Sequence, residues 1–335
     1  MSHRPSGRGF RCGDHPVSDS PRTAAAVLGH DAAVHAFRSA WAAGRLHHAW
    51  LLHGPEGIGK ATLAFRLARI VLGAEDMASP EGRRVSAGTH ADLLVIRRGF
   101  DEKRGRPRAE IVMDDVAPIQ QFLRRTAAEA GWRVVLIDGA EYLNRNAANA
   151  LLKLLEEPPP KAVILMTSAA PGRLLPTIRS RCRRLGLDPL DGSTMRAVLT
   201  GQGQPDDVIA RLIAEGAGAP GRAARLALDS DGAIADFVSG TLDGTVAPSA
   251  ILAQSERIAR QDDGFAVFTE LLGARLAMSA RAAGHAGDVA AAAAQARAFR
   301  AIEDLRRETE RFNLDKAVAV QMAVAVATGD DQAGS

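Results

Sequence analysis

A glycine-rich loop between a predicted strand and a predicted helix limits the fold of this chain most strongly. Residues 54–60 read Gly-Pro-Glu-Gly-Ile-Gly-Lys and fit the G-x-x-x-x-G-K pattern. A short apolar run at residues 48–53 precedes this loop, and an amphipathic pattern at residues 61–72 follows it. Glycines let backbone N–H groups turn inward around phosphate oxygens, and the N-terminus of the next helix attracts the same anion. The sequence therefore predicts the phosphate loop of a P-loop NTPase.

The predicted cofactor-binding residues are those of the loop and the first turn after it: Gly54, Pro55, Glu56, Gly57, Ile58, Gly59, Lys60, Ala61 and Thr62. Lys60 is expected to reach the outer phosphates. Position 61 ordinarily carries a Ser or Thr hydroxyl for Mg²⁺, and here it is Ala61. Thr62 is turned by about 100° from that position on a helix. ATP with Mg²⁺ is the ligand that such a loop could take, with impaired positioning of the metal.

Two further apolar runs, at residues 133–138 and 162–167, predict buried strands, and they alternate with helical patterns at residues 114–130 and 146–156. This alternation predicts an α/β fold with a parallel sheet covered on both faces. The intervening stretch 74–108 is interpreted as a loop-rich surface excursion that carries a basic tract.

Strand patterns end near residue 189, and helical patterns fill the rest of the chain, separated by a Gly-rich polar passage at residues 229–248. The fold class predicted is thus an α/β P-loop domain followed by a small helical lid and an all-α C-terminal collar. The expected divisions are a disordered tail at 1–22, a nucleotide-binding domain at 23–188, a lid at 189–244 and a collar at 245–330.

The run Val-Val-Leu-Ile-Asp at residues 134–138 looks like a Walker B strand, whose Asp138 would hold Mg²⁺ at the carboxyl edge of the sheet. A Glu that activates water normally follows this Asp in active ATPases, but Gly139 follows it here. Glu141 is interpreted as an acid at the start of a helix, and a role in orienting water stays open. Because the substitutions at positions 61 and 139 affect the same step, hydrolysis by this chain itself is predicted to be weak or absent.

Several runs together resemble the clamp-loader family of AAA+ proteins, which includes the bacterial gamma/tau and delta-prime subunits of DNA polymerase III. The most specific is Asn-Ala-Leu-Leu-Lys-Leu-Leu-Glu-Glu-Pro-Pro at residues 149–159. The other similar runs are at residues 44–49, 138–144, 177–182 and 312–315. The missing hydroxyl and the missing Glu favour the delta-prime type, and an active gamma/tau-like ATPase is the alternative.

This resemblance implies a subunit of a five-membered ring, with gamma/tau and delta as neighbours, that opens the sliding clamp and places it on primed DNA during replication. It assigns Arg181 as an arginine finger that acts in trans on a neighbour's ATP, and Thr167 as a sensor at the end of its strand. Arg222 lies near the second sensor, one residue away from the active pattern. The C-terminal helices would form the collar.

The cysteine content, the hydropathy and the net charge bear on whether the protein holds a metal, spans a membrane or binds DNA. The chain has two cysteines, Cys12 and Cys182, so the four zinc-binding cysteines usual in the family are missing and no structural zinc is expected. No apolar run approaches the roughly 20 residues of a membrane helix, which predicts a cytoplasmic protein without a membrane partner. The net charge of +3 is small. A stand-alone DNA-binding regulator, based on the basic tract at residues 97–108, is a further alternative.

Overall fold

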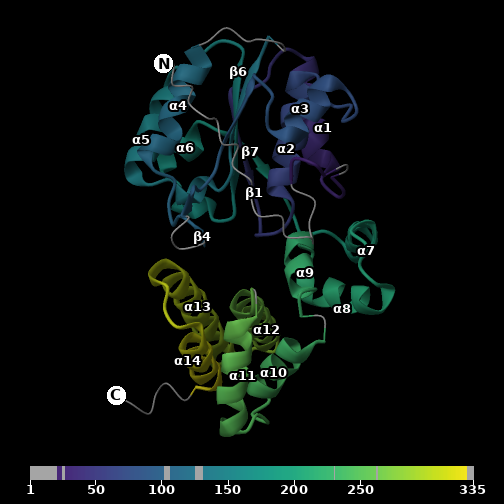
Figure 1. Cartoon of the computed structure of the whole chain (residues 1–335), viewed down its shortest axis with the longest axis vertical. Helices are drawn as coiled ribbons and strands as arrows, with labels where there is room; N and C mark the ends of the chain where they lie inside the picture. The colour runs from purple at the N-terminus through teal and green to yellow at the C-terminus, as the bar shows by residue number, and fades with distance from the viewer. Residues whose placement is uncertain are drawn as a thin grey trace, which may run out of the picture.

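The computed structural model describes residues 21–24, 27–101, 106–124, 131–229, 231–261 and 263–329. Figure 1 shows an α/β part at the top, a group of short helices below it on one side, and long helices at the bottom. The predicted tail lies outside the described residues except for its last two. One of these, Arg22, accepts a hydrogen bond at its carbonyl oxygen from the buried Arg69 (2.7 Å).

Five strands form a parallel sheet in the order β2-β5-β6-β1-β7. Their bounds are β1 Ala49–His53, β2 Leu93–Ile96, β5 Arg133–Ile137, β6 Ala162–Ser168 and β7 Arg183–Gly186. β1 lies between β6 and β7, and Leu52 of β1 is in register with Thr167 and Leu185. This parallel sheet confirms the predicted fold class. Because all five strands run the same way, the segments that follow β1, β5 and β6 meet at one edge.

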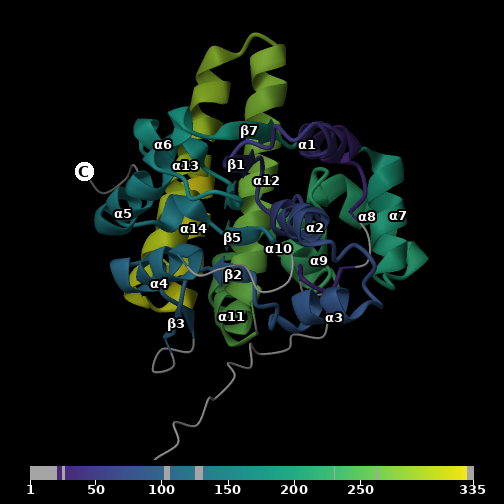
Figure 2. The ribbon, with the colours of Figure 1, turned by 90° about the horizontal axis from the view of Figure 1, so that it is seen from above.

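Helices cover both faces of the sheet, as Figures 1 and 2 show. On one face lie α1 Asp31–Ala42, α2 Lys60–Leu72 and α3 Pro80–Ala87, and on the other lie α4 Met113–Arg124, α5 Arg145–Glu156 and α6 Pro176–Ser180. The alternation along β5 shows why both layers are needed. Val134 and Leu136 belong to the core under α1 and α2, whereas Val135 and Ile137 belong to the core under α4 and α5. All four side chains are fully buried, so each face stabilises the sheet through the hydrophobic effect.

The prediction of a loop-rich stretch at residues 74–108 was wrong. The segment contains α3, the strand β2 and a small hairpin of β3 Phe100–Asp101 and β4 Arg106–Pro107. β2 has only four residues and becomes a strand because it pairs with β5, a long-range contact that a local pattern does not show. Two arginines of the basic tract have partners on the protein: Arg98 lies 3.9 Å above the ring of Tyr142, and Arg108 pairs with Asp115 at 3.3 Å.

The rest of the chain is helical, as predicted. It consists of α7 Gly192–Gly201, α8 Asp206–Gly216, α9 Pro220–Leu226, α10 Ala233–Leu242, α11 Pro248–Arg260, α12 Gly264–His285, α13 Val289–Phe312 and α14 Lys316–Thr328. α10 corrects the interpretation of residues 229–248 as a Gly-rich passage. Buried residues from Leu190 to Val324 form one continuous core across the predicted lid and collar, and the three-part division stays a prediction. In the part of the chain that the structure describes, no helix is long and apolar enough to cross a membrane.

Candidate phosphate-binding site and candidate arginine finger

The predicted phosphate loop leaves the carboxyl end of β1 and enters α2, as the sequence requires. Gly59 caps the N-terminus of α2 with φ +98°, and Gly57 has φ +76°. L-residues with a side chain rarely adopt these values, so glycine is needed at both positions. The loop therefore has the local backbone geometry that places N–H groups around an anion at a helix N-terminus.

Lys60, the loop lysine, contacts the loop itself. Its Nζ donates hydrogen bonds to the carbonyl oxygens of Gly54 (2.9 Å) and Pro55 (2.6 Å). Burial lowers the pKa of Lys60. Negative charge on three nearby carboxylates opposes this lowering of the pKa, namely those of Glu141, Glu56 and Asp138. Two of the three ammonium donors are thus used within the loop, and one remains for an incoming phosphate.

The loop also rests against the N-terminus of α9. Gly221 donates its backbone N–H to the carbonyl oxygen of Gly57 (2.8 Å). A Cβ on Gly57 would lie 2.7 Å from the backbone nitrogen of Arg222, so only glycine allows this approach. From the other side, His30 Nε2 lies 2.9 Å from the carbonyl oxygen of Ile58. The protein's own groups thus hold the loop on two sides.

Asp138 and Thr167, predicted from separate motifs, come together at the sheet edge. Thr167 Oγ1 donates to Asp138 Oδ1 at 2.6 Å and accepts from the backbone N–H of Gly139 at 2.9 Å. Both contacts arise because β5 and β6 are neighbours and end at the same level. The predicted Walker B aspartate is therefore oriented by the predicted sensor threonine.

The residues around the loop fit a phosphate group but do not complete a Mg²⁺ site. Ala61 offers only a methyl group in the first turn of α2. Thr62 lines a separate recess of about 410 Å³ together with Phe65 and Arg66. Asp138 is then the one predicted oxygen ligand at this edge. Among the residues described, no group of three or more His, Cys, Asp or Glu side chains could hold a metal ion. The expected lack of structural zinc stays a prediction.

Glu141 lies in the first turn of the short helix η1 Ala140–Tyr142, which fits its interpretation as a helix-start acid. Its Oε1 accepts a hydrogen bond from the backbone N–H of Ala169 at 2.8 Å. This bond ties η1 to the segment that follows β6. The other carboxylate oxygen, Oε2, is buried without a hydrogen-bond partner.

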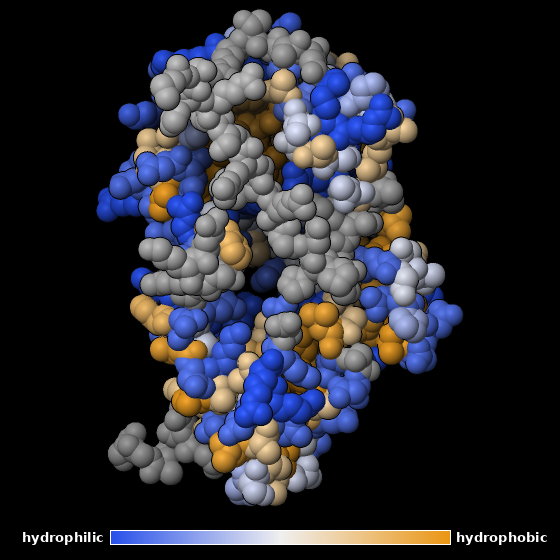
Figure 3. Space-filling view, in the orientation of Figure 1, coloured by the Kyte–Doolittle hydropathy of each residue, from blue (hydrophilic) through white to orange (hydrophobic). Residues whose placement is uncertain are grey.

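A cluster of ion pairs joins the loop to the helical part. Glu270 of α12 accepts hydrogen bonds from Arg222 Nε (2.8 Å) and Arg225 Nε (2.8 Å), both on α9. Glu56 of the phosphate loop lies 3.7 Å from Arg225 Nη2 and 3.9 Å from Arg306 Nη2 of α13. Figure 3 shows hydrophilic residues at this junction between the two parts on the face that it draws. Arg222, near the second sensor position, is thus bound to a carboxylate of α12.

We expect the Glu270 ion pairs to make stability depend on pH. Burial alone would raise the pKa of Glu270, but hydrogen bonds and charge from Arg225 and Arg222 outweigh burial and lower the pKa from its ordinary value of 4.5. The contribution of these ion pairs to the free energy of unfolding is therefore fully present above pH 4.5, and it is lost as pH falls through the lowered pKa of Glu270. Glu270→Gln should reduce the free energy of unfolding by about 1–3 kcal/mol at pH 7.

Urea unfolding of the original chain and the Gln variant from pH 7 to pH 3 measures this effect. The difference between the two should stay constant above pH 5 and shrink below about pH 4.5. A difference that remains the same down to pH 3 would contradict the assignment.

Arg181, the candidate finger, lies directly after α6 at the surface. Its Nη2 pairs with Glu156 Oε1 of α5 at 3.0 Å, and its Nη1 donates to the carbonyl oxygen of Thr177 at 3.1 Å. The Arg181 side chain is 37% exposed and that of Glu156 is 51% exposed. Exposed ion pairs of this kind contribute about 0–1 kcal/mol to the free energy of unfolding. The guanidinium could therefore leave Glu156 and bind a neighbouring molecule at small energetic cost. The role of Arg181 in trans stays a prediction.

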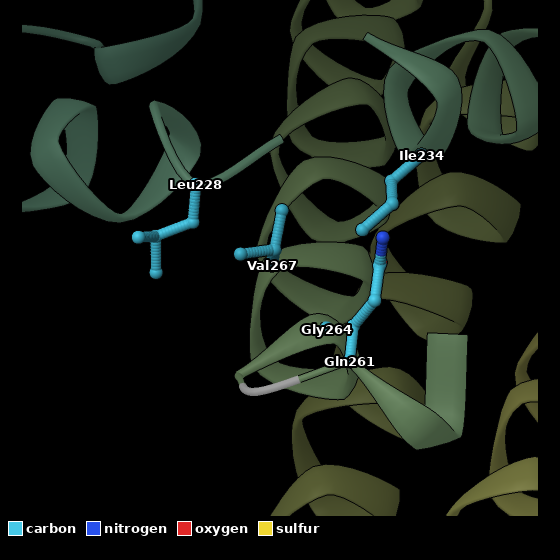
Figure 4. A pocket seen from close by; sticks show the side chains of 5 residues that line it. All are labelled: Leu228, Ile234, Gln261, Gly264 and Val267. Atoms are coloured by element: carbon cyan, nitrogen blue, oxygen red, sulfur yellow. The ribbon is translucent and has the colours of Figure 1, made fainter. Parts of the chain in front are cut away.

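A recess in the helical part is unrelated to these residues. It has a volume of about 230 Å³, and Figure 4 shows its lining side chains, in which Gln261 is the only polar group of the five labelled. The lining consists of Leu228, Ile234, Gln261, Gly264 and Val267. None of the predicted site residues contributes to it, and it offers no charged group to a phosphate.

The sequence reasoning missed Glu270, Arg225 and Arg306. A signal for Glu270 did exist, because it stands in the run Phe-Thr-Glu-Leu-Leu at residues 268–272, and acids are almost never fully buried unless they are paired. Its side chain is 7% exposed. The two arginines carried no such signal, since arginines are frequent throughout the C-terminal helices.

Comparisons with known proteins show similarity to subunits of DNA polymerase III. The DNA polymerase III subunit delta' of Pseudomonas aeruginosa is 39% identical over 188 residues, which are 53% of this chain and 55% of that protein. The Escherichia coli subunit delta' is 34% identical over 161 residues (45% of each chain). The Escherichia coli subunit tau is 33% identical over 183 residues, which are 52% of this chain and 27% of tau. This chain thus spans about half the length of the delta' proteins.

A solved structure of a gamma subunit-related protein of DNA polymerase III from Thermotoga maritima has a TM-score of 0.46 and 18% identity. The alignment covers 84% of this chain and 94% of that chain.

The parallel sheet with β1 between β6 and β7, together with the loop at residues 54–60 between β1 and α2, has the arrangement predicted for a P-loop domain. The family described as "DNA polymerase III, delta subunit" matches residues 29–191. Over this region, the chain is similar to that family and to the delta' subunits named above.

Proposed function

We propose that this chain acts as the delta-prime subunit of a clamp loader that places the sliding clamp on primed DNA during replication. In this proposal it joins gamma/tau and delta subunits in a heteropentamer, supplies Arg181 to a neighbour's ATP, and hydrolyses little ATP itself. One observation carries the proposal: the hydroxyl and the acid needed for hydrolysis are replaced by Ala61 and Gly139, while Arg181 lies at the surface in an exposed ion pair.

The chemistry of phosphoryl transfer explains how one subunit can assist hydrolysis at a neighbour's site and hydrolyse little ATP itself. A guanidinium stabilises charge on the transferring phosphate without changing its own protonation, so it can serve a site on another subunit. In contrast, a metal ligand and a water-orienting acid must lie within the site that they serve. Losing both and keeping the guanidinium leaves a subunit suited to completing a neighbour's site.

An active gamma/tau-like ATPase is the second candidate, favoured by the match to tau and by the position of Glu141 close enough to Lys60 to oppose the lowering of its pKa. Against this candidate, Gly139 stands directly after Asp138, where active ATPases carry the Glu that activates water. The backbone N–H of Ala169 binds only Oε1 of Glu141, so Oε2 could accept a proton and a direct assay is needed.

The purified chain alone separates these candidates. We expect ATP turnover with Mg²⁺ to stay at the background level and to be the same in the original chain, in Lys60→Ala and in Glu141→Gln. The assay measures phosphate release over hours, with an active gamma/tau subunit as the positive control. Rapid turnover that disappears in both variants would establish the gamma/tau-like alternative and refute the proposal.

A further inference from the structure

The arginines next to the phosphate loop are already bound to carboxylates of the protein. We propose that Glu270, assisted by Glu56, is an internal competitor for nucleotide phosphates: it holds the two arginines of α9 and thereby weakens nucleotide binding by this chain. The inference rests on the proposed function in one respect, because it takes residues 54–60 as the phosphate site.

The position of α9 places these arginines at the site. Gly221, in the first turn of α9, touches the loop residue Gly57 through the 2.8 Å backbone hydrogen bond. Arg222 follows immediately, and Arg225 lies one turn further along the same helix. Side chains that begin so close to the loop are within reach of a phosphate bound there, yet both extend to α12.

Glu270 uses both carboxylate oxygens to hold them. Oε1 accepts from Arg222 Nε (2.8 Å) and Arg225 Nη2 (3.0 Å), and Oε2 accepts from Arg225 Nε (2.8 Å). The pairing with Arg225 is thus bidentate, the strongest arrangement for a guanidinium and a carboxylate. Because the Glu270 side chain is only 7% exposed, water screens these contacts little.

Glu56, a residue of the loop itself, is a second carboxylate close to these arginines. It lies 3.7 Å from Arg225 Nη2 and 3.9 Å from Arg306 Nη2, and its side chain is 57% exposed. Arg306 is also paired with Glu303 at 3.4 Å. Since the contacts of Glu56 are longer and exposed, its share should be smaller than that of Glu270.

A phosphate offers a guanidinium the same bidentate geometry as a carboxylate. Nucleotide can use the α9 arginines only by leaving Glu270 buried without its partners, which is unfavourable. A ligand gains affinity when a competing internal contact is removed, and couplings of this kind typically change affinity by about 5–150-fold. Neutralising Glu270 should therefore tighten nucleotide binding.

The test titrates the full chain with a fluorescent ATP analogue, with Mg²⁺ and with EDTA. We expect Glu270→Gln to lower the Kd about 10-fold and Glu56→Gln to lower it about 3-fold. Adding Lys60→Ala should abolish the gain in each case, which shows that the analogue binds at the loop. The matched control is Glu215→Gln, which removes an ion pair between α8 and Arg275 of α12 (3.7 Å) without touching an arginine beside the loop.

Three results would overturn the inference: no tightening in the two variants, no detectable binding by any of the proteins, or equal tightening by Glu215→Gln. If Glu270→Gln does not fold, Glu56→Gln decides alone, because its exposed side chain carries no core contacts. A different experiment tests the proposed function. It would be refuted by hydrolysis in the assembled complex that does not need Arg181, a result on which the titration does not depend.

Discussion

Replacing Arg181 with alanine should slow ATP hydrolysis by about 10³-fold or more at the neighbouring site that it completes in the assembled complex. The physical reason is that a guanidinium placed at the transferring phosphate stabilises charge that develops only in the transition state. Arg181→Lys should lose most of the effect as well, since a single ammonium group cannot form the planar fork. Single-turnover hydrolysis by the complex, reconstituted with each variant, measures the rate at that site.

Assembly should be unaffected by Arg181→Ala, because the only described contacts of its guanidinium are Glu156 and the carbonyl oxygen of Thr177. Glu156→Ala is the matched variant: it removes the partner and leaves the guanidinium free, so hydrolysis should not slow. Arg183→Ala controls for the general loss of positive charge, since Arg183 lies over the ring of Trp50 in the next strand. Full hydrolysis by the Arg181→Ala complex would refute the assignment.

Phe268→Ala should lower the free energy of unfolding of the helical part by about 3–5 kcal/mol. Phe268 is fully buried in α12 and lies with its ring centroid 5.8 Å from that of Phe237 in α10. Its removal leaves a cavity in the core shared by residues 190–324. Phe312→Ala, at a position 60% exposed, is the control and should change stability by less than about 0.5 kcal/mol.

The tryptophans make this measurement selective. Trp41, Trp50 and Trp132, the three in the chain, all belong to the α/β part. Fluorescence in urea therefore follows the α/β part, while far-ultraviolet circular dichroism follows the helices of both parts. Phe268→Ala should shift the dichroism transition to lower urea. A loss below about 1 kcal/mol would show that residues 190–324 do not share one tightly packed core.

Much of the candidate site was predictable because it is local. The glycines of residues 54–60, the strand before them and the helix after them are each recognised from a short contiguous stretch of sequence. The same holds for Asp138 at the end of its strand. The hydrogen bond between Asp138 and Thr167 was not predicted, and it forms because β5 and β6 lie side by side and end together. Strand β2 was missed because its four residues become a strand only through pairing with β5.

The sequence by itself determined the glycine-rich loop at residues 54–60, the alanine at position 61, the glycine at position 139 and the alternation of strands and helices. The tertiary structure alone decided what surrounds the loop: the approach of α9 to Gly57 and the capture of Arg222 and Arg225 by Glu270. These arginines lie 48 and 45 residues before Glu270 in the chain. No periodic pattern connects residues so far apart, and only the packing of α9 against α12 brings a buried carboxylate to the cations that it neutralises.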